Sequence, residues 1–124
     1  VHFEKSNIIH TGDTFFNGFY PFIDVEHGGS IDGMIKAAGI TLGLANDQTK
    51  IIPGHGPLGN KKQLAAFRDM LIKARDAIKM AAKGGKSPEQ VAKADPLKAL
   101  NAKWGNGFLK PPIFVRIVLG GMKR

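Results

Sequence analysis

Two short motifs carry the side chains best suited to chemistry. The first is Asn7-Ile8-Ile9-His10-Thr11-Gly12-Asp13, and the second is Lys50-Ile51-Ile52-Pro53-Gly54-His55-Gly56-Pro57. In each, an apolar β-branched run ends in a glycine-containing turn that presents one possible metal ligand, Asp13 or His55. Open α/β sheets bind ligands at the carboxyl ends of their strands, so the two side chains can converge on one site. Taken singly, Asp13 could instead organise an Asx-turn, and His55 could be a structural loop residue.

The segments around these motifs predict alternating strands and helices. Residues 1–5 and 7–11 have the composition of two short strands, and residues 49–52 that of a third, buried strand. Residues 13–29 show neither the helical nor the strand period of apolar residues, and we expect them to form a long loop. This loop is expected to pack through its aromatic side chains, Phe15, Phe16, Phe19, Tyr20 and Phe22. Ser30 is a suitable N-cap for a helix that runs to about Asn46. This order of strand, helix and strand predicts an α/β layered sheet.

The second half of the chain predicts helices. Asn60 caps the strongest helical pattern, which reaches about Lys83 and carries an apolar stripe of Leu64, Phe67, Leu71, Ala74, Ile78 and Ala81. The run Ser87-Pro88-Glu89-Gln90 combines a cap, a first-turn proline and a glutamine at the third position, which predicts another helix start. Residues 104–119 are expected to form a short helix or strand that docks on the core.

Composition limits the chemistry and the partners. The chain has 124 residues, 43% of them hydrophobic, which suits one domain or part of one. Without cysteine, a metal site must use histidine and carboxylate ligands. No apolar run is long enough to span a membrane and no signal peptide is visible, so we expect a cytoplasmic protein, although the start at Val1 leaves room for an upstream segment.

Charge is divided unevenly between the two halves. Residues 1–60 carry three basic and six acidic side chains, whereas residues 61–124 carry fifteen basic and four acidic ones. Such a basic half could bind nucleic acid or a membrane surface. A solvated, lysine-rich helical surface explains it better, because few aromatic side chains lie among the lysines for base stacking.

The two motifs together resemble the second half of the metallo-β-lactamase-fold hydrolases. A strand that ends in Thr11-Gly12-Asp13, a helix, and a strand that ends in Pro53-Gly54-His55-Gly56 carry the resemblance, which is most specific over residues 8–58. The helix that contains Leu64-Ala65-Ala66-Phe67-Arg68 is also similar to that superfamily. The resemblance implies half of an αββα sandwich, with residues 1–58 forming the metal-site half and residues 59–124 a mostly helical C-terminal portion. Bacterial metal-dependent hydrolases of unassigned substrate are the nearest group.

The resemblance also implies roles for individual residues. Asp13 would bridge two zinc ions and His55 would bind the second of them, so that an activated water could attack an ester, thioester, lactam or phosphoester of a small-molecule substrate. The family's His-x-His-x-Asp-His cluster is absent, since the histidines are His2, His10, His27 and His55. We therefore expect a C-terminal fragment with no complete catalytic site of its own.

Other residues, and the chain as a whole, allow more than one interpretation. His10 could support the site or face a substrate, or be a half-buried strand residue, and Tyr20 could orient a substrate. The aromatic loop could border a cleft or form core. As a whole, the chain could pair with a missing N-terminal half, act as a non-catalytic homo-oligomer through unpaired strand edges, or, least favoured, bind nucleic acid.

Overall fold

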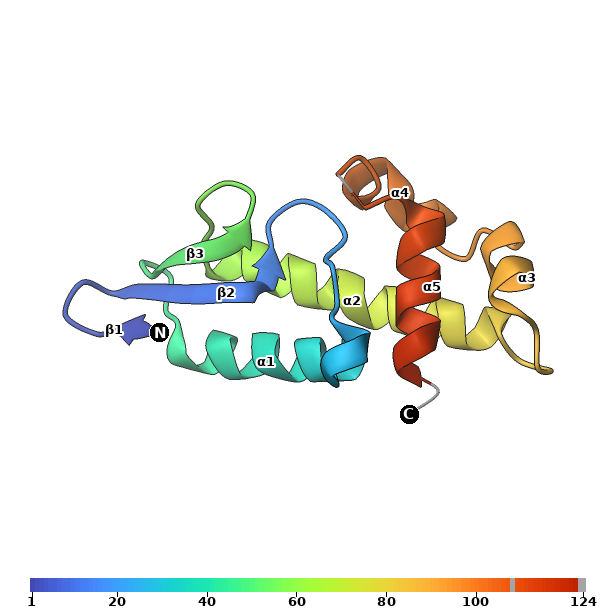
Figure 1. Ribbon diagram of the computed structural model, residues 1–124. Coiled ribbons are helices and arrows are strands. Elements are labelled where there is room, and N and C mark those ends of the chain that lie inside the picture. The colour runs from blue at the N-terminus through green and yellow to red at the C-terminus, as the bar shows by residue number, and fades with distance from the viewer. Residues whose placement is uncertain (108, 123–124) are drawn as a thin grey trace.

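The computed structural model describes residues 1–107 and 109–122 and has a mixed α/β architecture (Figure 1). Its strands are β1 (His2–Phe3), β2 (Ile8–Phe16) and β3 (Lys50–His55), in the sheet order β1-β2-β3. Its helices are α1 (Ile31–Leu44), α2 (Lys61–Ala81), α3 (Pro88–Lys93), α4 (Lys98–Trp104) and α5 (Pro111–Met122), with a 3₁₀ turn, η1, at Val25–His27. Phe108, within the predicted tail segment, lies outside the described residues.

The sheet contains the expected strand-helix-strand unit. β1 pairs antiparallel with β2, and β2 pairs parallel with β3 through the crossover helix α1. The expectation that the strand over residues 7–11 ends before Asp13 is wrong, as is the loop assigned to residues 13–16, because β2 continues to Phe16. β3 likewise runs beyond Ile52 to His55. An irregularity at Gly12 shifts the β2–β3 register, and extended pairing resumes after it because Phe15 and Phe16 enter the core.

Local capping signals explain where the helices begin. The Ser30 hydroxyl accepts a hydrogen bond from the Gly33 amide at the start of α1. The Asn60 side chain forms a reciprocal capping box with Gln63 at the start of α2, and Ser87 does the same at the start of α3. Each box satisfies two backbone N–H groups that a helix start otherwise leaves without partners. All three predicted helix starts are confirmed.

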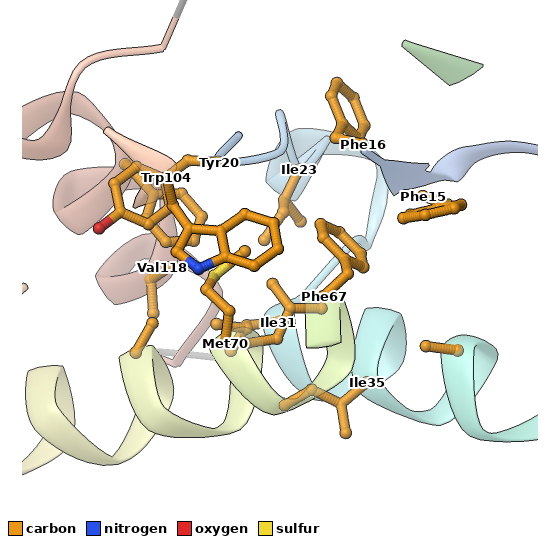
Figure 2. Packing of buried hydrophobic residues seen from close by; sticks show 14 of the residues in the cluster. Phe15, Phe16, Tyr20, Ile23, Ile31, Ile35, Phe67, Met70, Trp104 and Val118 are labelled. Atoms are coloured by element: carbon orange, nitrogen blue, oxygen red, sulfur yellow. The ribbon is translucent and has the colours of Figure 1, made fainter. Parts of the chain in front are cut away.

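The core lies along α2, which extends from the sheet at one end of the molecule to α3 at the other (Figure 1). Its predicted apolar stripe is buried except for Ala81, which is half-buried, and Met70 joins the stripe. Figure 2 shows Phe67 and Met70 of α2 among Phe15, Tyr20 and Trp104, which come from distant segments. Burying such side chains stabilises a fold by about 1.5–3 kcal/mol each, so this helix holds the sheet and the C-terminal helices together.

The sheet has one covered and one open face. Ile9 and Ile51, which are register partners, are buried in the core with α1 and α2. The alternate residues Ile8, His10 and Ile52 are half-buried or exposed. In the described part of the chain, no helix is long and apolar enough to cross a membrane.

Candidate metal-binding site

Asp13 is presented by the irregular point in β2. Gly12 adopts a positive φ of 57°, and its amide donates to Nδ1 of His10 at 3.1 Å instead of extending the ladder. The Thr11 hydroxyl donates to the Ile52 carbonyl at 2.9 Å, which ties the irregularity to β3. Because the strand turns here, the Asp13 side chain is directed outward and is 78% exposed.

His55 is held at the end of β3 by the segment that follows β2. Its carbonyl accepts a hydrogen bond from the Asn17 amide at 3.0 Å. Its imidazole stacks on Phe16, with ring centroids 4.8 Å apart and an interplanar angle of 22°. The buried Asn17 side chain also donates to the Pro57 carbonyl at 2.9 Å, so it fixes the turn after His55. These contacts orient the imidazole while its side chain remains 51% exposed.

Gly54 allows β3 to approach β2 closely at Gly12 and Asp13. A Cβ atom at this position would lie 2.6 Å from the Gly12 carbonyl oxygen and would also overlap Oδ1 of Asp13. Any side chain would therefore push the β2 backbone and the carboxylate away from β3. The glycine before His55 is a steric requirement of the Asp13 position.

The donor atoms of the pair are close enough to share one ion. Oδ1 of Asp13 lies 3.7 Å from Nε2 of His55. Two ligands bound at about 2.0–2.1 Å in tetrahedral geometry are about 3.3 Å apart, so a shift of a few tenths of an ångström would let both atoms bind one zinc ion. Carboxylate and imidazole are both zinc ligands, so the donor chemistry fits.

The pair is an incomplete site. Zinc in proteins takes three or four protein ligands. Among residues 1–107 and 109–122, no three His, Cys, Asp or Glu side chains are grouped closely enough to hold a metal ion. A zinc ion bound by Asp13 and His55 would therefore need further donors.

The other candidate residues lie elsewhere. His10 is on β2 but is exposed rather than half-buried, and its Nδ1 accepts the Gly12 amide, which leaves Nε2 as the protonated nitrogen of the neutral ring. Tyr20 is fully buried, its hydroxyl donates to Oδ1 of Asn101 at 2.8 Å, and its ring stacks on Phe114. Burial raises the pKa of Tyr20 to about 12. This buried position does not agree with the prediction that Tyr20 orients a substrate.

The aromatic loop divides between core and surface. Phe15, Phe16 and Tyr20 are buried, whereas Phe22 is 50% exposed beside a cleft that reaches Asp13. Sequence reasoning missed the role of Asn17. A polar residue directly after two buried phenylalanines and before Gly18 was the available signal, because a buried amide must find hydrogen-bond partners.

Comparison of the chain with protein-family models, curated proteins and solved structures finds no match.

Proposed function

We propose that Asp13 and His55 are two ligands of a zinc site in a metallo-β-lactamase-type hydrolase, of which this chain forms one part. The 3.7 Å separation of their donor atoms, between the irregular point of β2 and the carboxyl end of the adjacent parallel strand β3, is the observation that carries the proposal. Side chains on neighbouring parallel strands of an α/β sheet can act on one ligand. Zinc supplies Lewis-acid chemistry, polarising a carbonyl or phosphoryl group and activating water for attack.

The open sheet face supports the same proposal. In a sandwich, each sheet is covered by helices on one face and by the other sheet on the second face. Here α1 and α2 cover one face, while Ile8 and Ile52 of the other face remain partly exposed. A second layer that covers Ile8 and Ile52 would complete an αββα arrangement and could carry the remaining zinc ligands. The chain by itself would then bind zinc weakly and hydrolyse nothing.

The expected zinc affinity follows from the number of ligands. Complete four-ligand structural sites bind zinc with about 10–16 kcal/mol. If two ligands contribute about half of that, the dissociation constant lies between about 1 μM and about 200 μM. Both side chains are exposed, so they can bind without unfolding the strand ends.

Zinc titration followed by NMR of the histidine ring protons tests the proposal. The signals of His55 should shift before those of the other histidines, and Asp13→Asn should abolish that preference. The pair formed by His27 and Asp24, whose Nδ1 and Oδ2 atoms lie 2.8 Å apart on the surface, is a matched control. Equal shifts at His27 and His55 would refute a specific site. Binding tighter than about 0.1 μM would refute the incomplete set of ligands.

Self-association is a second candidate, favoured by the same open face. A second copy could cover Ile8 and Ile52 and shield the exposed Val1 and the exposed Phe3 of β1. Sedimentation of the chain should then reveal a dimer that Ile52→Lys dissociates. The same substitution at Ile40, an exposed residue on α1, should leave the dimer intact. A monomer at high concentration would eliminate this candidate.

A further inference from the structure

A cleft of about 400 Å³ begins at Asp13 and extends toward the start of α1. Its walls come from four segments: β2 after the irregularity, the loop that precedes η1, the loop between η1 and α1, and the first turns of α1. The side chains that shape it are Asp13, Thr14, Phe22, Ile23, Met34 and Ala37. Its volume falls in the lower part of the usual range for small-molecule pockets, about 300–1,000 Å³.

Carbon atoms dominate the part of the cleft beyond Asp13. Ile23 is buried, Met34 and Ala37 are half-buried on α1, and the ring of Phe22 is half exposed. A ligand group placed there would cover Phe22 and would meet aliphatic carbon from Met34 and Ala37. Covering such surfaces is favourable for an apolar group, at about fourfold in affinity for each buried methylene.

The polar atoms at the edge of the cleft already have partners. The Thr14 hydroxyl donates to the Thr11 carbonyl at 2.8 Å, and the Ser30 hydroxyl accepts from the Gly33 amide at 3.0 Å. The Asp24 carboxylate contacts Nδ1 of His27 at 2.8 Å. Such groups offer little to a ligand that needs many hydrogen bonds.

Charge decides between the remaining ligand classes. Asp13 and Asp24 are the charged residues of the lining, and none of the described residues that line the cleft is Lys or Arg. An anionic ligand would meet two carboxylates without a compensating cation. Because Asp24 is paired with His27 and Asp13 faces the proposed zinc site, a cationic ligand would have to compete for both.

We infer that this cleft binds an uncharged, medium-length acyl group of the substrate. The inference rests on the proposed function, since it places the acyl chain against Phe22, Met34 and Ala37 while the carbonyl end lies beside Asp13. It narrows the substrate to esters, thioesters or amides with an apolar acyl portion. Phosphoesters, which are anionic, are disfavoured by the two carboxylates.

Methyl NMR of the whole chain labelled at methionine tests the inference without any metal. Octanamide, octanoate and octylamine serve as neutral, anionic and cationic probes of equal length. Octanamide should shift the Met34 methyl in a saturable way and leave that of Met80, which is 69% exposed on α2, unchanged. Butanamide should bind more weakly, by up to about fourfold for each methylene removed. Octanoate should bind at least about tenfold more weakly than octanamide.

Two variants keep the test independent of folding defects. Ala37→Leu should fill the cleft and weaken octanamide binding by about tenfold or more, whereas Ala102→Leu, at an exposed site on α4, should leave it unchanged. Phe22→Ala, at a half-exposed position, should also weaken binding in a ligand-observed saturation-transfer experiment.

Specific outcomes overturn the inference. These are tighter binding of octanoate or octylamine, equal shifts at Met34 and Met80, or unchanged affinity in both cleft variants. Because no zinc is present, these outcomes do not bear on the metal site. Selective octanamide binding together with unselective zinc binding would retain the cleft and refute the proposed function, and the reverse result would refute only the cleft.

Discussion

Gly54→Ala tests whether β3 at Gly54 packs against β2 at Gly12 as closely as the structure indicates. The new methyl group would lie 2.6 Å from the Gly12 carbonyl oxygen, which belongs to backbone and cannot rotate away. It would also overlap Oδ1 of Asp13. Either β2 must move away from β3 at the irregularity, or the β3 end must bend outward. Both movements disturb the parallel pairing between Gly12 and Pro53.

The cost can be placed within a range. Adding a methyl group to a closely packed site costs about 1–3 kcal/mol. For a chain of 124 residues, this corresponds to a fall in melting temperature of roughly 3–15 °C. Because the carboxylate must also move, Gly54→Ala should abolish the selective shift of the His55 signals on zinc addition.

Urea unfolding followed by circular dichroism at the helical band measures the free energy of unfolding. Gly43→Ala is the matched control, because a Cβ atom at that position in α1 meets nothing within 4 Å. Alanine has a higher helix propensity than glycine, so this control should be neutral or more stable by up to about 1 kcal/mol. The two identical substitutions should thus differ in sign.

Two results would refute this reasoning. If Gly54→Ala changes the free energy of unfolding by less than about 0.5 kcal/mol, β3 at Gly54 and β2 at Gly12 are not in close contact. A change of that size is usual at open surface sites. If Gly54→Ala is destabilised but keeps the selective zinc response, the Asp13 position does not depend on Gly54.

Three further substitutions test the core and the turn after His55. The free energy of unfolding should fall between about pH 10, the ordinary pKa of tyrosine, and about pH 12. The reason is that Tyr20 loses its proton at a lower pH in the unfolded chain than in the folded one. Urea titrations at each pH measure this dependence, and Tyr20→Phe should remove it. Asn17→Ala leaves the Pro57 carbonyl without its hydrogen-bond donor and should cost about 1–3 kcal/mol of stability. The control Asn106→Ala, at an exposed site, should cost less than about 0.5 kcal/mol. Urea unfolding measures both. Phe67→Ala removes a fully buried ring and should cost about 3–5 kcal/mol, so a loss below 1 kcal/mol in the same assay would contradict the packing.

Much of the secondary structure could be predicted because its causes are local. The N-caps Ser30, Asn60 and Ser87 act on amides three residues away, and the apolar spacing of α2 repeats within each turn. The extent of β2 and β3 could not be read in this way. Extended backbone past Asp13 depends on pairing with residues some 40 positions later, which leaves no nearby sequence signal.

The sequence by itself determined the residue types, the strand-helix-strand order and the two strand-end motifs that contain Asp13 and His55. Only the tertiary structure decided which candidates meet. It brings Asp13 and His55 to 3.7 Å because parallel pairing places the irregular point of β2 beside the end of β3 and Gly54 leaves room between them. It takes Tyr20 into the core because Phe114, from a helix nearly a hundred residues later, covers its ring. Side-chain direction depends on these long-range contacts, and residue spacing along the chain does not encode them.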